Sequence, residues 1–269
     1  MREEYMSCYT TLGVGGKAWV KAACSVADLS DTPDGSVILG GGSNTLIGEK
    51  NLPMFIINRV KGAVFNGEEA YFMSGESLSA VRTMAAERGL SGLEWAVGIP
   101  GTVGGALAGN AGTRSGDIAS SVDYVDVIEG KSFVRMPAGA CGFAYRQSAL
   151  SGRIIVGAGM TFTRRTRQEI EQNQQAAAKL RSRQPEGRSA GCIFKNPPGI
   201  SIGKIMDRLG LKGKRHGAAM ISPKHANFIV NEGGATAGDV YYLICYAEEK
   251  LYKELGFMPR REVKIYGEF

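Results

Sequence analysis

Apolar side chains come in short runs or alternations along most of this chain, a pattern that predicts strands. These segments are 36–47, 54–60, 70–74, 122–128, 132–136, 153–163, 226–230 and 262–266. The first of them runs into a glycine turn, and the last lies close to the end of the chain. The pattern therefore predicts many short strands spread over the whole sequence.

Helical spacing is found in fewer places. In 76–88, apolar residues recur on one face and Gly89 follows as a stop signal; Thr166–Ser182 is polar and rich in Gln, Ala and Arg. We predict a short helix at Ser201–Leu209 and a longer one that begins with a capping box at Thr236–Asp239 and runs to Leu255. Because helices and strands are mixed rather than alternating, the fold class expected is α+β.

Composition narrows the class of protein. The 269 residues are 43% hydrophobic and 22% charged, which is typical of globular chains, but 38 are glycine, about twice the usual share. The net charge of +6 is spread out, which suits small anionic ligands better than nucleic acid. Five scattered cysteines argue against disulfides and a zinc site. Without a signal-like leader or an apolar run of about 18 residues, we expect no membrane insertion and a cytoplasmic location.

The glycines gather in two segments that follow apolar residues. Gly40–Asn44 has the form of a backbone nest for an anion, with side-chain donors at its end, although a tight turn between strands would look the same. Gly98–Gly112 contains apolar residues as well as glycine and is too rich in glycine to be regular throughout. We interpret it as a packed loop rather than a flexible linker. Two such loops suit a diphosphate and a flat ring.

A third segment, 189–197, contains several chemically functional side chains. It places the thiol of Cys192, the ammonium of Lys195 and the carboxamide of Asn196 between glycine and proline. Loops held by a scaffold often carry functional groups. By itself, each of these residues has an ordinary structural explanation, since an isolated cysteine is most often a small buried apolar residue.

Taken in order, six motifs resemble one known family. They are Thr10–Gly16, Gly40–Asn44, Gly98–Gly105, Phe143–Ser148, Ala190–Pro197 and Arg261–Lys264. This order is similar to that of the UDP-N-acetylenolpyruvoylglucosamine reductases (MurB), and the resemblance covers nearly the whole chain. The stretch from Ser148 to Thr163 is too short for the extra tyrosine loop of the longer members, so the chain resembles the shorter type.

The resemblance implies an architecture. It predicts a two-subdomain FAD-binding region of the vanillyl-alcohol-oxidase (PCMH) type and a C-terminal α+β substrate-binding domain. We expect FAD-binding subdomain 1 at 1–60, subdomain 2 at 61–170 with a returning strand at 257–269, and the substrate domain at 171–256.

It also implies an activity. Family members use non-covalent FAD, with NADPH as co-substrate, to reduce UDP-N-acetylglucosamine enolpyruvate to UDP-N-acetylmuramate in peptidoglycan synthesis. By resemblance, the cofactor-binding residues are Gly40, Gly41, Gly42, Ser43, Asn44, Gly98, Ile99, Pro100, Gly101, Thr102, Gly104, Gly105 and Asn110. The partners expected are small molecules, with no nucleic acid, no metal and a monomeric chain.

Three residues match the family's catalytic positions: Arg146, which would polarise a carboxylate, the proton donor Cys192, and the acidic Glu262. Serine is the commoner residue where this chain has Cys192, and a thiol is the stronger acid. We therefore expect Cys192 still to deliver the proton. Substrate contacts are expected at Tyr145, Arg183, Lys195, Asn196, His225 and Lys264.

Two other functions fit parts of the sequence. An FAD-dependent oxidase of the same superfamily, acting on an alcohol or hydroxy acid, would produce peroxide and need no NADPH. A binding module, either a nucleotide-sugar sensor or a basic nucleic-acid protein, would use the glycine loops structurally and stay colourless with FAD.

Overall fold

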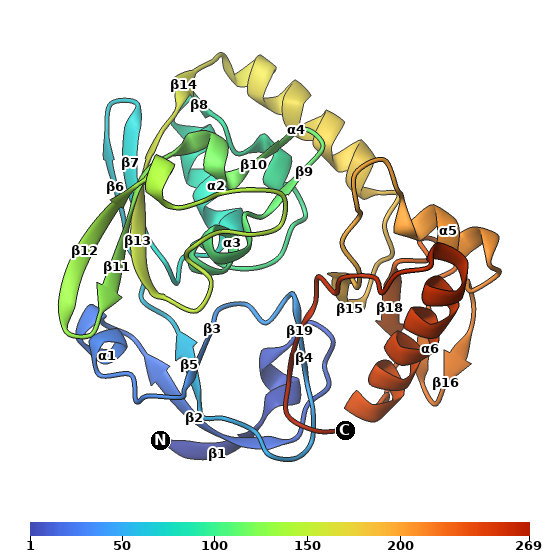
Figure 1. Cartoon of the computed structure of the whole chain (residues 1–269). Helices are drawn as coiled ribbons and strands as arrows, with labels where there is room; N and C mark the ends of the chain where they lie inside the picture. The colour runs from blue at the N-terminus through green and yellow to red at the C-terminus, as the bar shows by residue number, and fades with distance from the viewer. The chain divides into compact units, whose positions relative to one another are not determined.

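The computed structural model describes residues 1–269, which fold into two compact units. The first unit contains Met1, 20–41 and 55–181, and the second contains 2–19, 42–54 and 182–269. Figure 1 labels their helices and strands. Each unit is therefore assembled from segments that are far apart in the sequence. No helix combines the length and the apolar character that crossing a bilayer requires.

A small parallel sheet opens the first unit. Its central strand β5 (Phe55–Asn58) lies between β2 (Lys17–Ala23), which enters the unit at Val20, and β3 (Val37–Leu39). All four residues of β5 are buried, as expected for a strand that is paired on both sides. Helix α1 (Val26–Ser30) connects β2 to β3 and begins with a capping box between Ser25 and Asp28.

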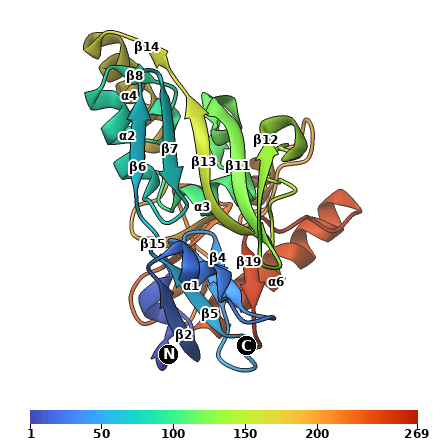
Figure 2. The same ribbon diagram turned by 90° about the vertical axis from the view of Figure 1, so that its left-hand side faces the viewer.

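The larger sheet of the first unit has five antiparallel strands in the order β12-β11-β13-β7-β6 (Figure 2). Helices α2 and α3 lie against one face of it (Figure 1). The strands are β6 (Ala63–Asn66), β7 (Glu69–Met73), β11 (Val122–Glu129), β12 (Ser132–Pro137) and β13 (Ile154–Thr161), and the helices are α2 (Leu78–Glu87) and α3 (Val103–Gly109).

Shorter elements complete this unit. Helix α4 (Arg167–Arg181) packs against the turn η2 and against α2. The remaining elements are β8 (Leu90–Ser91), η2 (Glu94–Ala96), β9 (Gly112–Thr113), β10 (Gly116–Asp117), η3 (Ile118–Ser121), η4 (Ala138–Ala140) and β14 (Thr163–Arg164).

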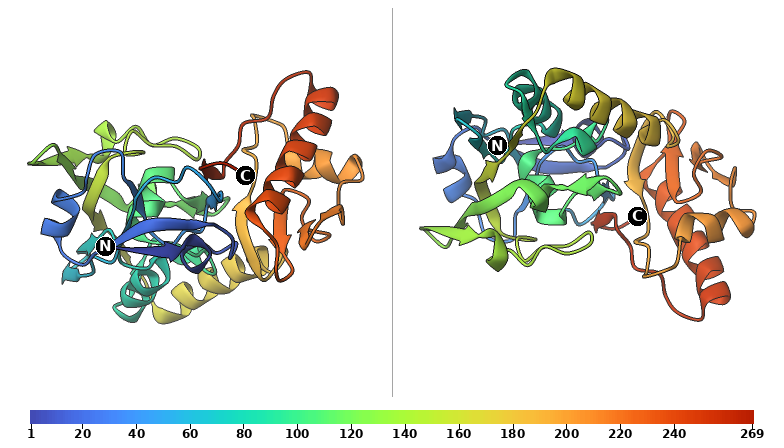
Figure 3. Two further views of the ribbon diagram at one scale, coloured as in Figure 1. Left: turned by 90° about the horizontal axis from the view of Figure 1, so that it is seen from below. Right: turned by 90° about the horizontal axis from the view of Figure 1, so that it is seen from above.

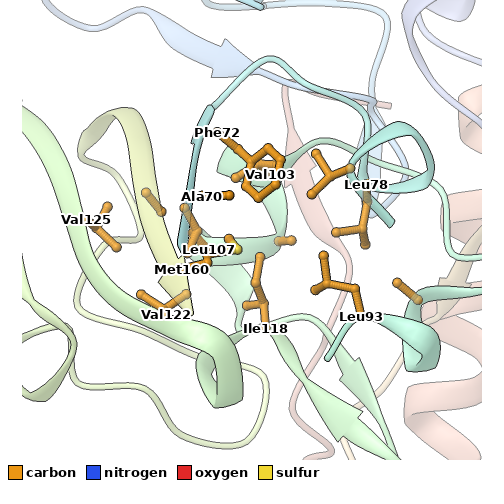
Figure 4. Packing of buried hydrophobic residues seen from close by; sticks show 14 of the residues in the cluster. Ala70, Phe72, Leu78, Leu93, Val103, Leu107, Ile118, Val122, Val125 and Met160 are labelled. Atoms are coloured by element: carbon orange, nitrogen blue, oxygen red, sulfur yellow. The ribbon is translucent and has the colours of Figure 1, made fainter. Parts of the chain in front are cut away.

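The core of the first unit lies between the five-stranded sheet and its helices (Figure 4). Phe72 of β7 is at its centre and meets Phe65 and Phe162 edge to face, at centroid distances of 5.4 and 6.2 Å. Leu78 and Val81 of α2 and Val103 and Leu107 of α3 belong to the same buried cluster. Both helices are therefore held by the apolar faces that they present to the sheet.

The second unit has its own core. Four antiparallel strands run in the order β15-β18-β17-β16, and the long helix α6 (Ala237–Leu255) lies along them (Figure 3). The strands are β15 (Arg188–Cys192), β16 (Arg215–His216), β17 (Ala219–Ile221) and β18 (Phe228–Asn231), with α5 (Ile202–Arg208) beside α6.

A parallel pair of strands joins the end of the chain to an early segment. Strand β19 (Lys264–Tyr266) pairs with β4 (Thr45–Ile47), with Lys264 opposite Thr45. Strand β1 (Arg2–Tyr5) and the turn η1 (Met6–Tyr9) also belong to this unit. The C-terminal strand therefore returns to the segment that follows the first glycine loop.

Most of the predicted elements are confirmed, including α2 with its left-handed Gly89, α4, and the capping box of α6. The glycine-rich stretch 98–112, predicted not to be regular throughout, contains helix α3 over Val103–Gly109. Strand β15 occupies residues that the sequence predicts to begin a loop. The two compact units divide the chain at points other than those of the predicted three-part division. That division into domains stays a prediction.

Replacing the central aromatic residue of the first core tests its role. Phe72 is 0% exposed, so Phe72→Ala leaves a cavity, and we expect the free energy of unfolding to fall by about 3–5 kcal/mol in urea titrations. The matched control is Phe133→Ala on β12, where the side chain is 64% exposed and the expected change is within about 0.5 kcal/mol. Equal effects of the two substitutions would contradict the assigned core.

Candidate functional site

The two glycine segments meet in the first unit. A side chain on Gly40 would collide with Thr102, and a Cβ on Gly41 would lie 2.9 Å from the Cα of Gly101. The second segment is itself fixed, because the N–H of Leu78 donates to Gly101 O (3.0 Å). The two loops therefore form one surface of backbone groups, which only glycine allows.

Helix α3 extends this surface. Its Gly105 and Gly109 lie four residues apart and so on one face, where added methyl groups would meet only Thr102 or nothing within 4 Å. The first N–H groups of the helix are used within the chain, since Val103 donates to Glu76 O and Gly104 to Ser74 O. The helix therefore offers a flat face without side chains, and its N-terminus is not an anion site.

Asn110 ends α3 in the left-handed conformation, with φ of 43°. Its side-chain nitrogen donates to Ala144 O (3.1 Å) and to Asp117 (3.3 Å), and its side-chain oxygen accepts from the N–H of Ala119. The carboxamide is thus engaged inside the protein. A role of Asn110 in cofactor binding stays a prediction, and these bonds limit it to the backbone.

The predicted Tyr145 and Arg146 lie in a tight turn that is tied to α3. Ala144 and Gln147 exchange backbone hydrogen bonds (3.0 and 3.1 Å), and the Ser148 hydroxyl donates to Leu107 O (2.9 Å). Arg146 has φ of 55°, a conformation that non-glycine residues rarely adopt. Backbone strain of this kind gathers at functional sites.

The end of the first glycine loop belongs to the second unit. Asn44 donates from its side-chain nitrogen to Glu262 O (3.1 Å), and its own carbonyl accepts from the N–H of Lys264 (3.0 Å). Gly42 must be glycine, because it has φ of 56° and a Cβ would collide with Tyr9 O. The donor of Asn44, predicted to serve a cofactor, is thus used to hold the backbone of Glu262.

Cys192 ends strand β15 directly after a bulge. Ser189 pairs with Val230 and Cys192 with Phe228, so β15 contains one extra residue, and Gly191 adopts φ of 77° there. Bulges re-aim side chains and are frequent beside active sites. Beyond the bulge, the side chain of the buried Asn227 takes the place of the strand-to-strand hydrogen bonds. Its amide nitrogen donates to Phe194 O (2.8 Å), and its oxygen accepts from the N–H of Phe194 (3.0 Å).

The last residues of the chain pair with this loop. The N–H groups of Glu262 and Val263 donate to Ile193 O (2.7 and 3.3 Å), and the N–H of Lys195 donates to Arg260 O (2.9 Å). These bonds join the segments that contain Cys192, Lys195 and Glu262. Within the second unit, the structure therefore places the proposed proton donor and its acidic partner on paired backbone.

Lys195 and Lys264 form the charged part of this cluster. Burial lowers the pKa of Lys264, and the nearby positive charge of Lys195 lowers it further. Two ammonium groups repel each other unless an anion lies with them. The pair therefore favours an anionic ligand.

His225 and Asn196 occupy defined places in the same unit. Burial lowers the pKa of His225, and its Nδ1 accepts from the N–H of Asn227 (3.2 Å), so the neutral ring carries its proton on Nε2. The Asn196 oxygen accepts from the N–H of Ile202 at the start of α5 (2.9 Å), which leaves its NH₂ as the group for a ligand. Arg183 lies exposed in the turn before β15.

Sequence reasoning missed Asn227 and Glu248. Asn227 precedes a run of buried apolar residues, and that isolated polar position was the available signal. Glu248 lies on the apolar face of α6 beside Ala247 and Leu251, where it breaks the helical pattern.

Known protein families match both the N-terminal and the C-terminal part of the chain. Residues 15–134 match the FAD binding domain family, and residues 183–266 match the family described as the C-terminal domain of UDP-N-acetylenolpyruvoylglucosamine reductase. The reductase of that name from Thermus thermophilus is 39% identical over 92% of this chain and 94% of the relative. The one from Chlamydia abortus is 36% identical over 98% of this chain and 93% of the relative.

A solved structure gives the same answer for the fold. The crystal structure of UDP-N-acetylenolpyruvylglucosamine reductase (MurB) from Thermus caldophilus superposes with a TM-score of 0.89 at 38% identity, over 99% of both chains. This chain therefore belongs to the UDP-N-acetylenolpyruvoylglucosamine reductase (MurB) family, with an FAD-binding domain followed by the family's C-terminal domain.

Proposed function

We propose that this chain uses NADPH and FAD to reduce UDP-N-acetylglucosamine enolpyruvate to UDP-N-acetylmuramate, a step of peptidoglycan synthesis. The observation that carries the proposal is the pairing of the Cys192 loop with the segment around Glu262, beside two lysines that favour an anion. We propose that the enzyme acts as a monomer in the cytoplasm.

The first unit suits FAD, because the surface formed by Gly40, Gly41 and Gly101 lets a diphosphate approach backbone groups. The side-chain-free face of α3 at Gly105 and Gly109 suits a flat ring. When FAD is bound, it supplies the redox chemistry, hydride acceptance from NADPH and hydride donation to the vinyl carbon of the substrate. Residues Gly98–Pro100, Thr102 and Gly104 complete the proposed cofactor site in this unit, and Gly42–Asn44 are assigned to FAD from their motif alone.

Reduction of the enolpyruvyl double bond also needs a proton at the neighbouring carbon. In the proposed mechanism, Cys192 donates this proton from the end of the bulged strand. Negative charge that develops on the substrate carboxylate is stabilised by Lys264, since preorganised cations lower the energy of such a transition state. Arg146 is assigned to the same carboxylate from its motif alone. Glu262 is assigned as the acidic partner in proton delivery.

The remaining assigned residues orient the nucleotide sugar. Lys195 contributes positive charge, Asn196 contributes its NH₂ group, and His225 contributes the N–H of Nε2. Tyr145 and Arg183 are exposed and are assigned to the outer parts of the substrate.

Anaerobic half-reactions test the function directly. NADPH should bleach the flavin of the purified yellow protein, and the enolpyruvyl substrate should restore the colour with formation of UDP-N-acetylmuramate. Peroxide production in air with an alcohol or hydroxy acid and without NADPH would instead favour the oxidase. A protein that stays colourless after addition of FAD would favour the binding module.

Removing the thiol isolates the proton transfer. We expect Cys192→Ala to slow flavin reoxidation by substrate at least about 100-fold, because a positioned acid contributes factors of that order. Flavin reduction by NADPH should stay unchanged, and Cys192→Ser should retain part of the reoxidation rate. Cys245→Ala, an exposed thiol on α6, serves as the control. Reoxidation of Cys192→Ala at the wild-type rate would remove Cys192 from the mechanism.

The lysine pair predicts a pH dependence of substrate binding. Because the pKa of Lys264 is lowered, its charge should be lost, and the substrate Kd should rise, at a pH below the usual lysine value of about 10.4. In Lys195→Met the rise should move to higher pH, since one of the two causes is gone. Flavin absorbance titrations measure both, with the exposed Lys253→Met as control. An unmoved profile in Lys195→Met would contradict the coupling.

The glycine surface predicts a steric effect on the cofactor. In Gly41→Ala the new Cβ must displace the backbone at Gly101, and overpacking of this kind costs about 1–3 kcal/mol. We therefore expect the Kd for FAD to rise about ten-fold or more in apoprotein titrations. Gly139→Ala is the matched control, because nothing lies within 4 Å of its new methyl group. Equal retention of FAD by both variants would count against this site.

A further inference from the structure

Glu248 is an acidic residue in an apolar place. It lies on α6 between the buried Ile244 and Leu251 and is only 7% exposed. A buried carboxylate is costly unless it is paired. Its partner is Arg261, whose Nε donates to Oε1 of Glu248 and whose Nη2 donates to Oε2 (2.5 Å). This bond raises the pKa of the Arg261 guanidinium, which therefore stays charged.

Such a pair is a weak source of net stability, because the cost of removing two charges from water offsets much of their attraction. Its geometry is more informative. Two parallel hydrogen bonds fix both the position and the orientation of the guanidinium plane. The guanidinium also lies 5.6 Å from the ring centre of Tyr241, on the same helix. Arg261 is thus anchored to α6 at several points.

Arg261 immediately precedes Glu262, and the backbone there is paired. Arg261 forms an isolated bridge with Phe194, whose side chain is fully buried. Because Arg261 and Glu262 are joined by one peptide unit, holding the side chain of Arg261 on α6 restricts the backbone from which the side chain of Glu262 extends.

The backbone of Glu262 is held on both sides as well. Its N–H donates to Ile193 O (2.7 Å), and its carbonyl accepts from the side chain of Asn44 (3.1 Å). These bonds fix the position of the Glu262 backbone, but they do not determine whether the side chain of Arg261 or that of Glu262 faces the core. The pairing of Arg261 with Glu248 determines it.

We propose that Glu248 is a positioning residue for the reaction: through its bidentate pair with Arg261, it sets the direction of the Glu262 carboxyl group during proton delivery. This inference rests on the proposed function, in particular on the role of Glu262. It predicts that Glu248 affects one half-reaction only, although it lies inside the core of the second unit.

The test is Glu248→Gln in the FAD-loaded enzyme. Glutamine keeps the shape but removes the charge and one acceptor of the pair. We expect reoxidation by the enolpyruvyl substrate to slow at least about ten-fold, as for loss of a charged hydrogen bond. Flavin reduction by NADPH and the substrate Kd should each change less than about two-fold, since the groups that bind are untouched.

The matched control is Glu249→Gln, the next residue on the same helix. Its carboxylate makes an exposed pair with Lys253 (2.5 Å), and neither half-reaction should change. Equal slowing of both half-reactions by Glu248→Gln, or loss of FAD, would mean a purely structural role and would overturn the proposal. If Glu248→Gln does not fold, Arg261→Lys decides by the same measurements, because lysine keeps the charge and loses the two-pronged geometry.

A double variant separates this inference from the function on which it rests. If Glu248 acts through Glu262, Glu248→Gln adds no further slowing to Glu262→Gln. Multiplying effects would mean independent roles and would overturn the proposal. Normal reoxidation in Glu262→Gln would refute the proposed role of Glu262 itself. Slow reoxidation in Glu262→Gln with normal reoxidation in Glu248→Gln would refute only the positioning role.

Discussion

The second unit depends on the backbone pairing between the end of the chain and the loop after β15. Ile193 O accepts from both Glu262 and Val263, and Lys195 donates to Arg260 O. These bonds join segments far apart in the sequence, so loop-closure entropy opposes them, and buried neighbours must compensate for it. Phe194 and Val263 are both buried within the core that α6 covers. The chemistry of the site therefore stands on contacts that form only when this unit has folded.

Carboxamide side chains support the pairing where regular strands stop. Asn227 satisfies both backbone groups of Phe194, Asn44 reaches Glu262 O, and Asn231 donates to Leu12 O (2.9 Å) while accepting from two N–H groups. An amide side chain carries both a donor and an acceptor, so it can stand in for a missing strand. The bulge at Gly191 can thus re-aim Cys192 without leaving backbone groups of Phe194 unpaired.

The sequence predicts features that depend on neighbouring residues and misses those that depend on residues far apart in the chain. Helices α2 and α6 were predicted because their caps, apolar faces and terminal glycines lie within the helices and their flanks. Helix α3 was missed because three of its seven residues are glycine, and it persists through the burial of Val103 and Leu107. The motif residues of the site were predicted by resemblance. The role of Glu248 was not, because it depends on Arg261, thirteen residues later and on another element.

The backbone pairing at the end of the chain also explains how Lys195 and Lys264 are kept near each other. Lys195 is fixed by its N–H bond to Arg260, and Lys264 by its N–H bond to Asn44, so neither backbone can move away to relieve the repulsion. That repulsion, added to burial, lowers the pKa of Lys264. In the proposed mechanism, an anionic ligand offsets this repulsion. The backbone pairing keeps the two lysines on neighbouring segments, where their combined charge favours the negative charge that develops on the proposed substrate.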